Sequence, residues 1–213
     1  MTIRAILWDF GGVITSSPFE AFGRFEQERG LPVDFLRRVN STNPDNNAWA
    51  RFESSRISLE EFDREFEIES GNAGHPIPGR LVLDLLGGDV RPRMVEVLKR
   101  CKEDYQVVCL TNNMNTGAGP GIWRGAERQA AVDAALQVFH EVIESSKIGL
   151  RKPDPRIYAL ACERMRVAPA EVAYLDDLGI NLKPAKAMGM QTIKVVSEAQ
   201  AIADLGQVLR REF

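Results

Sequence analysis

Short, continuous apolar runs recur along the chain, and most of them end at a glycine or a polar residue. The first run, Ala5-Ile-Leu-Trp8, stops at Asp9 and is followed by Gly11 and Gly12. Runs of this length without polar alternation are typical of strands buried on both faces of a parallel sheet. The pattern predicts five such strands, at residues 5–8, 106–111, 142–143, 172–175 and 192–196.

Helical patterns separate these predicted strands from residue 92 onward. They cover residues 92–102, 126–137 and 181–189, a segment that starts at Asp154, and the C-terminal residues after Ser197. Asp154, Asn181 and Ser197 are expected to cap helices, Ser197 in a capping-box pattern with Gln200. Strands that alternate with helices predict an α/β fold built on a doubly wound parallel sheet.

Residues 18–88 follow a different pattern from the rest of the chain. Apolar residues recur there at helical spacing, for example at Phe19, Phe22 and Phe25, and again over residues 59–66. Proline, glycine and asparagine interrupt these stretches, and no convincing strand pattern occurs between them. We therefore expect a small all-helical insert placed after the first strand.

Composition and charge exclude several classes of protein. The 213 residues are 44% hydrophobic and carry 27 Lys and Arg against 30 Asp and Glu, a formal net charge of −3. This balance gives no support to a nucleic-acid or membrane-surface partner. Asp9 cuts the N-terminal apolar run, which predicts neither a signal peptide nor a membrane span. Three widely separated cysteines, with no paired spacing, indicate free thiols in the reducing interior of a cell, and we expect a cytoplasmic protein.

Polar residues stand at the carboxyl ends of the first four predicted strands. In doubly wound sheets the ligand crevice lies beyond these ends, so the side chains are expected to meet there. A carboxylate can attack phosphorus, a second carboxylate can hold a hard cation, and ammonium, hydroxyl and amide groups can position a phosphoryl group. Each residue alone is more often a loop or capping residue, but together they indicate a site. They are Asp9, Thr111, Asn112, Lys152, Asp176 and Asp177.

Four short motifs around these residues resemble, in order, those of the haloacid dehalogenase superfamily. Residues 145–158 and 175–185 are especially similar to the phosphatase domain at the N-terminus of soluble epoxide hydrolases. They are also similar to the related domain of acyl-CoA dehydrogenase fusion proteins. The motifs are Asp9-Phe-Gly-Gly-Val, Leu110-Thr-Asn112, Lys152-Pro-Asp-Pro and Leu175-Asp-Asp177.

The resemblance implies a division of the chain and a cofactor. Residues 1–14 and 89–213 correspond to the catalytic core, and residues 15–88 to a helical cap. The expected cofactor is Mg²⁺, held by Asp9, the backbone carbonyl of Gly11, and Asp177. The resemblance further implies a small-molecule phosphate monoester as substrate, hydrolysed through an aspartyl phosphate.

The resemblance also implies a role for each site residue. Asp9 is the expected nucleophile, and Asp176 supports the site and orients Lys152. Thr111, the backbone of Asn112, and Lys152 are expected to hold the phosphate. Asn181 matches a position that ties the acidic loop in place.

Gly11 departs from the pattern of phosphatases in this superfamily. Such enzymes usually carry an aspartate there, which protonates the leaving group and later activates water. A metal-independent 2-haloacid dehalogenase and a catalytically weak binding module therefore stay open as alternatives. True dehalogenases usually lack the paired acids that stand here as Asp176 and Asp177, which favours a phosphatase. A phospho-accepting receiver domain is disfavoured because its acidic pair follows the first strand.

Several other features carry no chemical prediction. His75 and His140 have no ligand-type residues at metal spacing nearby, and we expect both to be structural. The Gly-rich segment 113–125 predicts a flexible loop, and Trp123 within it is expected to pack. The sequence indicates neither the physiological substrate nor the oligomeric state.

Overall fold

One sheet of five parallel strands forms the centre of the protein, in the order β3-β2-β1-β4-β5. The structure is a computed structural model that describes residues 2–113 and 126–213. The predicted parallel sheet is confirmed. Its strands are β1 (Ala5–Trp8), β2 (Gln106–Thr111), β3 (Glu141–Glu144), β4 (Val172–Asp176) and β5 (Gln191–Lys194).

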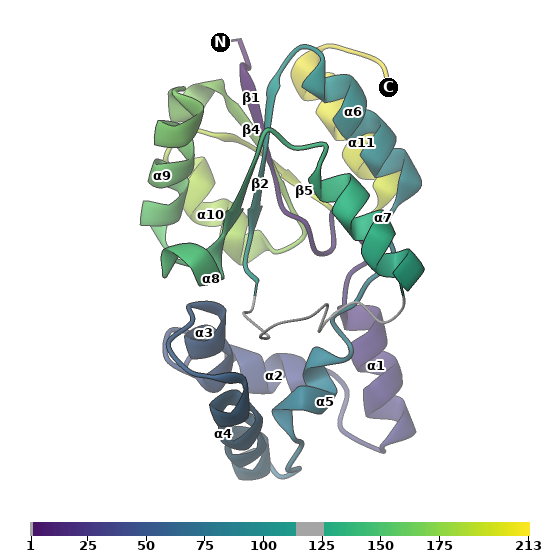
Figure 1. Ribbon diagram of the computed structural model, residues 1–213, viewed down its shortest axis with the longest axis vertical. Coiled ribbons are helices and arrows are strands. Elements are labelled where there is room, and N and C mark those ends of the chain that lie inside the picture. The colour runs from purple at the N-terminus through teal and green to yellow at the C-terminus, as the bar shows by residue number, and fades with distance from the viewer. Residues whose placement is uncertain (1, 114–125) are drawn as a thin grey trace.

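Helices cover both faces of this sheet, as the doubly wound prediction requires (Figure 1). Along β1, Ile6 and Trp8 join the apolar cluster of one face, whereas Ala5 and Leu7 join that of the other. This alternation follows from the two-residue period of a strand. The first face is covered by α6 (Pro92–Lys102), α7 (Ala126–Leu136) and α11 (Glu198–Leu209). The second is covered by α9 (Pro155–Met165) and α10 (Gly179–Ala187).

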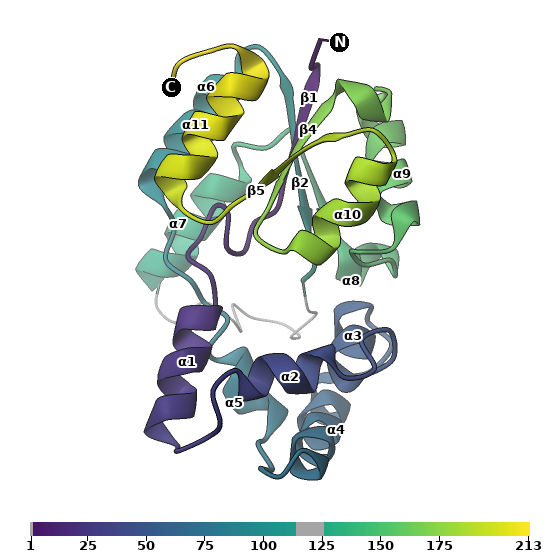
Figure 2. The same ribbon diagram turned by 180° about the vertical axis from the view of Figure 1, so that it is seen from behind.

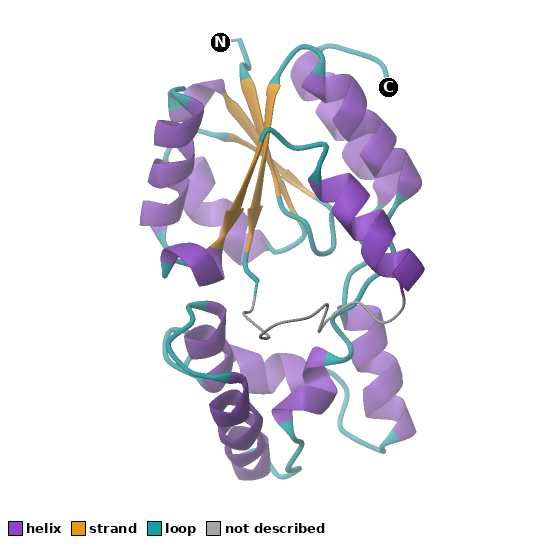
Figure 3. Ribbon diagram, viewed as in Figure 1, coloured by secondary structure: helices purple, strands orange, loops and turns teal. Residues whose placement is uncertain are grey.

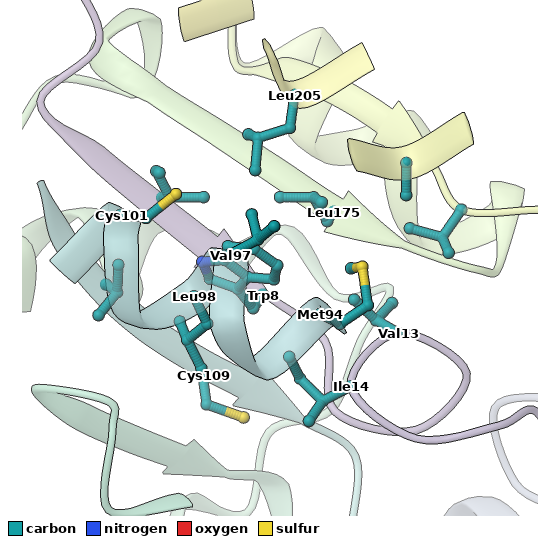
Figure 4. Close-up of a cluster of buried hydrophobic side chains, with 14 of the residues drawn as sticks. Trp8, Val13, Ile14, Met94, Val97, Leu98, Cys101, Cys109, Leu175 and Leu205 are labelled. Atoms are coloured by element: carbon teal, nitrogen blue, oxygen red, sulfur yellow. The ribbon is translucent and has the colours of Figure 1, made fainter. Parts of the chain in front are cut away.

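The core of the first face is centred on Trp8. Figure 4 shows its side chain among residues of α6, including Val97 and Leu98, with Leu175 of β4 nearby. All four residues are buried, Trp8 completely. Burying large apolar side chains of this kind contributes roughly 1.5–3 kcal/mol each. The strand that leads to Asp9 is therefore packed against α6 on this face of the sheet.

Two of the three predicted helix caps are confirmed and one is wrong. Asp154 accepts a hydrogen bond at the start of α9, and Ser197 forms a capping box with Gln200 at the start of α11. Asn181 does not cap a helix, because α10 begins at Gly179. The Asp176 carboxylate accepts the bond from the backbone N–H that precedes this helix, which frees Asn181 for another contact.

A helical insert, defined here as α1 to α5, lies between β1 and α6 beyond the carboxyl ends of the strands (Figures 1 and 2). It has its own buried cluster, built largely of phenylalanines such as Phe52, Phe62 and Phe66. Among the described residues it contains helices and loops only (Figure 3). The helices are α1 (Phe19–Glu28), α2 (Phe35–Ser41), α3 (Ala48–Glu53), α4 (Leu59–Asn72) and α5 (Gly79–Leu83).

The two connections between the insert and the sheet run side by side. Thr15 and Val90 form an antiparallel bridge, and the backbone N–H of Ser16 donates to the Asp89 carbonyl at 2.8 Å. The chain thus leaves and re-enters the sheet region at one place. The division into a core of residues 1–14 and 89–213 and a cap of residues 15–88 stays a prediction.

In the described part of the chain, no helix combines the length and the apolar character needed to cross a membrane.

Candidate active site

The site lies at the point where the strand order changes direction, between the carboxyl ends of β1 and β4. Trp8 pairs with Leu175 in the register of these strands, and the Asp9 N–H donates to the Leu175 carbonyl at 2.9 Å. Asp176 is the last residue of β4. Crevices at such switch points are the usual ligand sites of open α/β sheets. The fold therefore brings Asp9 and Asp176 together at the expected edge.

Three carboxylates form one compact group at this edge. One oxygen each of Asp9, Asp176 and Asp177 lies within 4.8 Å of the others. Asp176 is completely buried, Asp9 is 7% exposed, and Asp177 is half-buried. The Ser17 hydroxyl donates to Asp177 Oδ2 at 3.3 Å. A cluster of hard oxygen donors with so little solvent fits Mg²⁺ better than a softer metal.

Lys152 bridges two members of this group. Its Nζ atom lies 2.8 Å from Asp9 Oδ1 and 2.8 Å from Asp176 Oδ2, and the residue is only 1% exposed. Burial alone lowers the pKa of an ammonium, but the two neighbouring carboxylates outweigh it and raise the pKa of Lys152. Lys152 is therefore a fixed positive charge inside the site at any physiological pH.

Burial also changes the acids themselves. It raises the pKa of Asp9 well above the usual value, and the Asp176 and Asp177 charges add to the increase while Lys152 opposes it. For Asp177, burial followed by the charge of Asp176 raises the pKa to about 6. Crowded carboxylates of this kind favour a bound cation or proton, because their mutual repulsion is otherwise unbalanced.

Asp176 is held by a network that involves side chains from β4 and α10. It accepts hydrogen bonds from the Tyr174 hydroxyl, from Asn181 Nδ2 at 3.1 Å and from the Leu178 N–H at 2.8 Å. The Tyr158 hydroxyl in turn donates to the Asn181 carbonyl at 2.7 Å. The contact of Asn181 joins α10 to the end of β4.

Sequence reasoning missed both tyrosines. Tyr174 stands two residues before Asp176 in a strand, so the two side chains point to the same face of the sheet. That spacing was a usable signal for Tyr174. Tyr158 lies on α9 and reaches the site only through the folding of distant segments.

Thr111 and Asn112 stand at the carboxyl end of β2 and are half-buried. The side chain of Asn112 has a defined role that the sequence did not predict. Its Oδ1 accepts from the Lys152 N–H at 2.8 Å, and its Nδ2 donates to the Lys152 carbonyl at 3.0 Å. Asn112 therefore fixes the backbone from which the Lys152 side chain extends.

The two glycines after Asp9 have different surroundings. Gly12 has a left-handed φ of 75°, and a Cβ atom there would overlap the Asp177 carboxylate. A Cβ atom at Gly11 would meet no heavy atom within 4 Å. Position 12 thus requires glycine, whereas position 11 has open space where related phosphatases are expected to carry an aspartate.

The remaining predicted features lie away from this group. His140 Nδ1 accepts from the Val107 N–H at 3.0 Å, and His75 packs edge-on against Phe35. Residues 114–125, including Trp123, lie outside the described residues. A cleft of about 620 Å³ lies where the insert meets the loop around Lys152, beside the site. Asp9 is not among its lining residues. Its lining residues are Asp45, Ser54, Arg56, Gly149, Leu150, Arg151, Pro153, Asp154, Pro155 and Arg156.

Two longer proteins from Mus musculus are similar to the chain over nearly its whole length. Acyl-CoA dehydrogenase family member 10 is 31% identical over 212 residues, which cover 97% of this chain and 19% of that protein. Bifunctional epoxide hydrolase 2 is 28% identical over 225 residues, which cover 100% of this chain and 40% of that protein. The chain therefore spans less than half the length of either relative.

Relatives named as phosphatases and as dehalogenases both occur. Glyceraldehyde 3-phosphate phosphatase of Methanopyrus kandleri is 28% identical over 159 residues, 65% of this chain and 67% of that protein. (S)-2-haloacid dehalogenase 1 of a Pseudomonas species is 35% identical over 72 residues, 34% of this chain and 30% of that protein.

Solved structures support the same fold, and a family model identifies the chain. The magnesium complex of a HAD family enzyme from Bacteroides thetaiotaomicron superposes with a TM-score of 0.64 at 19% identity. The alignment covers 99% of this chain and 100% of that one. The model of haloacid dehalogenase-like hydrolases matches residues 3–189. The chain therefore belongs to the haloacid dehalogenase-like hydrolase family and is a hydrolase.

Proposed function

We propose that this hydrolase is a Mg²⁺-dependent phosphatase that acts on a small phosphate monoester through an aspartyl phosphate on Asp9. The observation that carries the proposal is the contact of Lys152 with both Asp9 and Asp176 inside the three-carboxylate group. One positive charge beside three acids leaves net negative charge, which suits a divalent cation and, through it, a phosphate dianion.

Asp9 is the proposed nucleophile. Its Oδ1 accepts hydrogen bonds from the Phe10 N–H at 2.7 Å and from Lys152, which fixes the orientation of the carboxylate. A carboxylate oxygen attacks phosphorus, the bond from phosphorus to the ester oxygen breaks, and the ester oxygen leaves as an alkoxide that takes a proton from water. Water then attacks phosphorus of the aspartyl phosphate, which releases inorganic phosphate and restores Asp9.

Asp9, Asp177 and the backbone carbonyl of Gly11 are the proposed ligands of Mg²⁺, which offsets negative charge on the phosphate oxygens when it is bound. Lys152, the Thr111 hydroxyl and the Asn112 N–H hold the transferring group. Tyr174, Asn181 and Leu178 all donate to the Asp176 side chain and fix its orientation. Its charge keeps Lys152 in place rather than taking part in bond making.

The glycine at position 11 supports a second candidate function. Metal-independent dehalogenases are expected to lack a side chain acid there, and a 2-haloacid dehalogenase occurs among the relatives. In that reaction Asp9 would attack the carbon that carries the halogen, and halide would leave without a proton. The acid pair at Asp176 and Asp177 supports the phosphatase over this alternative.

The test is a screen of phosphate monoesters and 2-haloacids, each with Mg²⁺ and with a chelator, using Asp9→Asn as the control. Phosphate release that needs both Mg²⁺ and Asp9 is the expected result. Halide release that survives the chelator and requires Asp9 would replace the proposal with the dehalogenase. Magnesium binding without turnover of any compound would indicate a binding module.

A further inference from the structure

Glu53 connects the helical insert to the site, although it belongs to neither the motifs nor the acidic group. It is the last residue of α3, and it is 7% exposed. A buried glutamate requires partners, since an unpaired carboxylate at such a position is strongly disfavoured. The partners of Glu53 come mostly from the core.

The Glu53 carboxylate joins three side chains. Its Oε2 accepts from Arg151 Nε at 2.8 Å and lies 2.7 Å from a second guanidinium nitrogen of the same residue. The same oxygen accepts from Asn112 Nδ2 at 3.4 Å. The other oxygen, Oε1, accepts from Trp49 Nε1 at 3.0 Å within the insert.

The backbone near Glu53 makes further contacts with the core. The Ser145 hydroxyl donates to the Glu53 carbonyl at 2.8 Å, and the Ser55 hydroxyl donates to the Ser146 carbonyl at 2.8 Å. Ser145 and Ser146 belong to α8 (Ser145–Ile148), which follows β3. The end of α3 is therefore seated on the core by side chain and backbone together.

Both core partners of the Glu53 carboxylate are direct neighbours of Lys152. Arg151 precedes it in the chain, and the Asn112 amide bonds both its N–H and its carbonyl. These contacts fix the peptide groups around Lys152. The position of Nζ between Asp9 and Asp176 depends on that backbone, because the Lys152 side chain is fully enclosed.

We propose that Glu53 is a positioning residue through which the seated insert aligns Lys152 for catalysis. This inference rests on the phosphatase function proposed above. When α3 is seated, Glu53 orients Arg151 and Asn112, and these hold the Lys152 backbone in register with Asp9. When α3 is displaced, the carboxylate is withdrawn and Lys152 loses this support. Transition-state stabilisation is thereby tied to the position of the insert.

Glu53→Gln tests the proposal while keeping the shape of the side chain, and Arg151→Gln tests the same contact from the core. Glu65→Gln is the matched control, because the Arg51–Glu65 ion pair is also partly buried but stays inside the insert. We expect Glu53→Gln and Arg151→Gln to lower kcat by roughly 10- to 100-fold, as supporting contacts of reacting groups do, with a smaller change in KM.

The double variant and the thermal midpoint separate positioning from stability. We expect the double variant to have the same kcat as the slower single variant. Each single change already removes the contact between Glu53 and Arg151, so the second change removes nothing further. Glu65→Gln should leave kcat within about twofold, because its ion pair with Arg51 lies inside the insert. The thermal midpoint of each variant reports its loss of stability separately from its loss of kcat. Equal kcat in wild type and Glu53→Gln, or an equal loss in Glu65→Gln, would overturn the proposal.

Amide hydrogen exchange keeps the inference testable if the wild type hydrolyses no phosphate ester. In that case the proposed function fails, and the positioning contact is measured directly. Exchange in residues 149–154 should be faster in Glu53→Gln than in wild type, and unchanged in Glu65→Gln. Equal exchange in all three proteins would show that Glu53 does not hold the Lys152 segment.

Discussion

Gly12 and Asp177 pack so closely that a side chain at position 12 would occupy the space of the Asp177 carboxylate. The turn after β1 therefore lies directly against the acidic turn after β4. The left-handed φ of Gly12 makes this approach possible without strain. The two adjacent glycines consequently have separate meanings: one permits the packing of the site, and the other leaves space beside it.

Gly12→Ala should destabilise the protein and weaken Mg²⁺ binding, whereas Gly11→Ala should do neither. The alanine at position 12 would combine an unfavourable φ with displacement of Asp177, at a cost of about 1–3 kcal/mol in the free energy of unfolding. Urea unfolding of both variants, with and without Mg²⁺, checks this. Equal stability of the two alanine variants would contradict the structural distinction.

Gly11→Asp should raise turnover of alkyl phosphates. A general acid typically contributes roughly 100- to 10,000-fold, and the open space at position 11 admits the side chain. In the wild type, rates on aryl phosphates should rise steeply as the leaving-group pKa falls, and the variant should flatten this dependence. Steady-state rates over a leaving-group series measure it. A flat dependence in the wild type would reveal a general acid elsewhere.

Asp9→Asn should abolish turnover and leave the fold intact. The amide has the shape of the carboxylate but cannot form the aspartyl phosphate. Circular dichroism and the thermal midpoint report the fold, and phosphate release reports turnover. Hydrolysis near the wild-type rate in purified variant protein would rule out Asp9 as the nucleophile.

Lys152→Met should lower kcat/KM by roughly 100- to 1,000-fold, the usual loss when one donor to the transferring group is removed. The variant should also lose stability. Asp9 and Asp176 would lose their shared counterion, and breaking a buried pair costs about 3–5 kcal/mol. The exposed pair of Arg164 and Glu141 gives a control: Arg164→Met should leave both quantities nearly unchanged.

The stabilisation gained from Mg²⁺ should increase as the pH rises through about 6. In the metal-free protein the pKa of Asp177 is raised from 3.8 to about 6. The folded protein therefore binds this proton more tightly than the unfolded chain does. The resulting stability is fully present below about pH 3.8 and is lost as the pH rises through about 6. Mg²⁺ binds the ionised Asp177, so its binding restores the stability that is lost when Asp177 releases its proton. Thermal melts on either side of this window check it; a gain independent of pH, or unchanged Mg²⁺ affinity in Asp177→Ala, would contradict the metal assignment.

The strands and their order of appearance could be predicted because each apolar run is local in the sequence and is buried on both faces. Asp9 and Asp176 could be placed together for the same reason, since parallel strands end at one edge. The capping role expected of Asn181 was wrong because a capping asparagine and one inside the first helical turn look alike in sequence. In the structure Asn181 lies inside α10, where its side chain donates to the Asp176 carboxylate instead of capping the helix.

The supporting contacts could not be predicted, since they join residues far apart in the chain. Glu53 and Arg151 are separated by 98 positions, and the Asn112 amide meets the Lys152 backbone across 40. The first contact depends on how the insert is seated on the core, and the second on how the segments after β2 and α8 meet within the core. No periodicity or motif within either segment specifies this arrangement.

The bridge between Thr15 and Val90 has an evolutionary consequence. Because the chain leaves and returns at adjacent points, the ends of the inserted segment are already held together by this bridge. The entropy of closing a loop between fixed ends grows by only about 0.6 kcal/mol for each doubling of its length. Lineages can therefore lengthen, shorten or exchange the helices between these two residues while the strand that leads to Asp9 keeps its register. The constraint that remains on the insert is the end of α3, where Glu53 contacts Arg151 and Asn112 of the core.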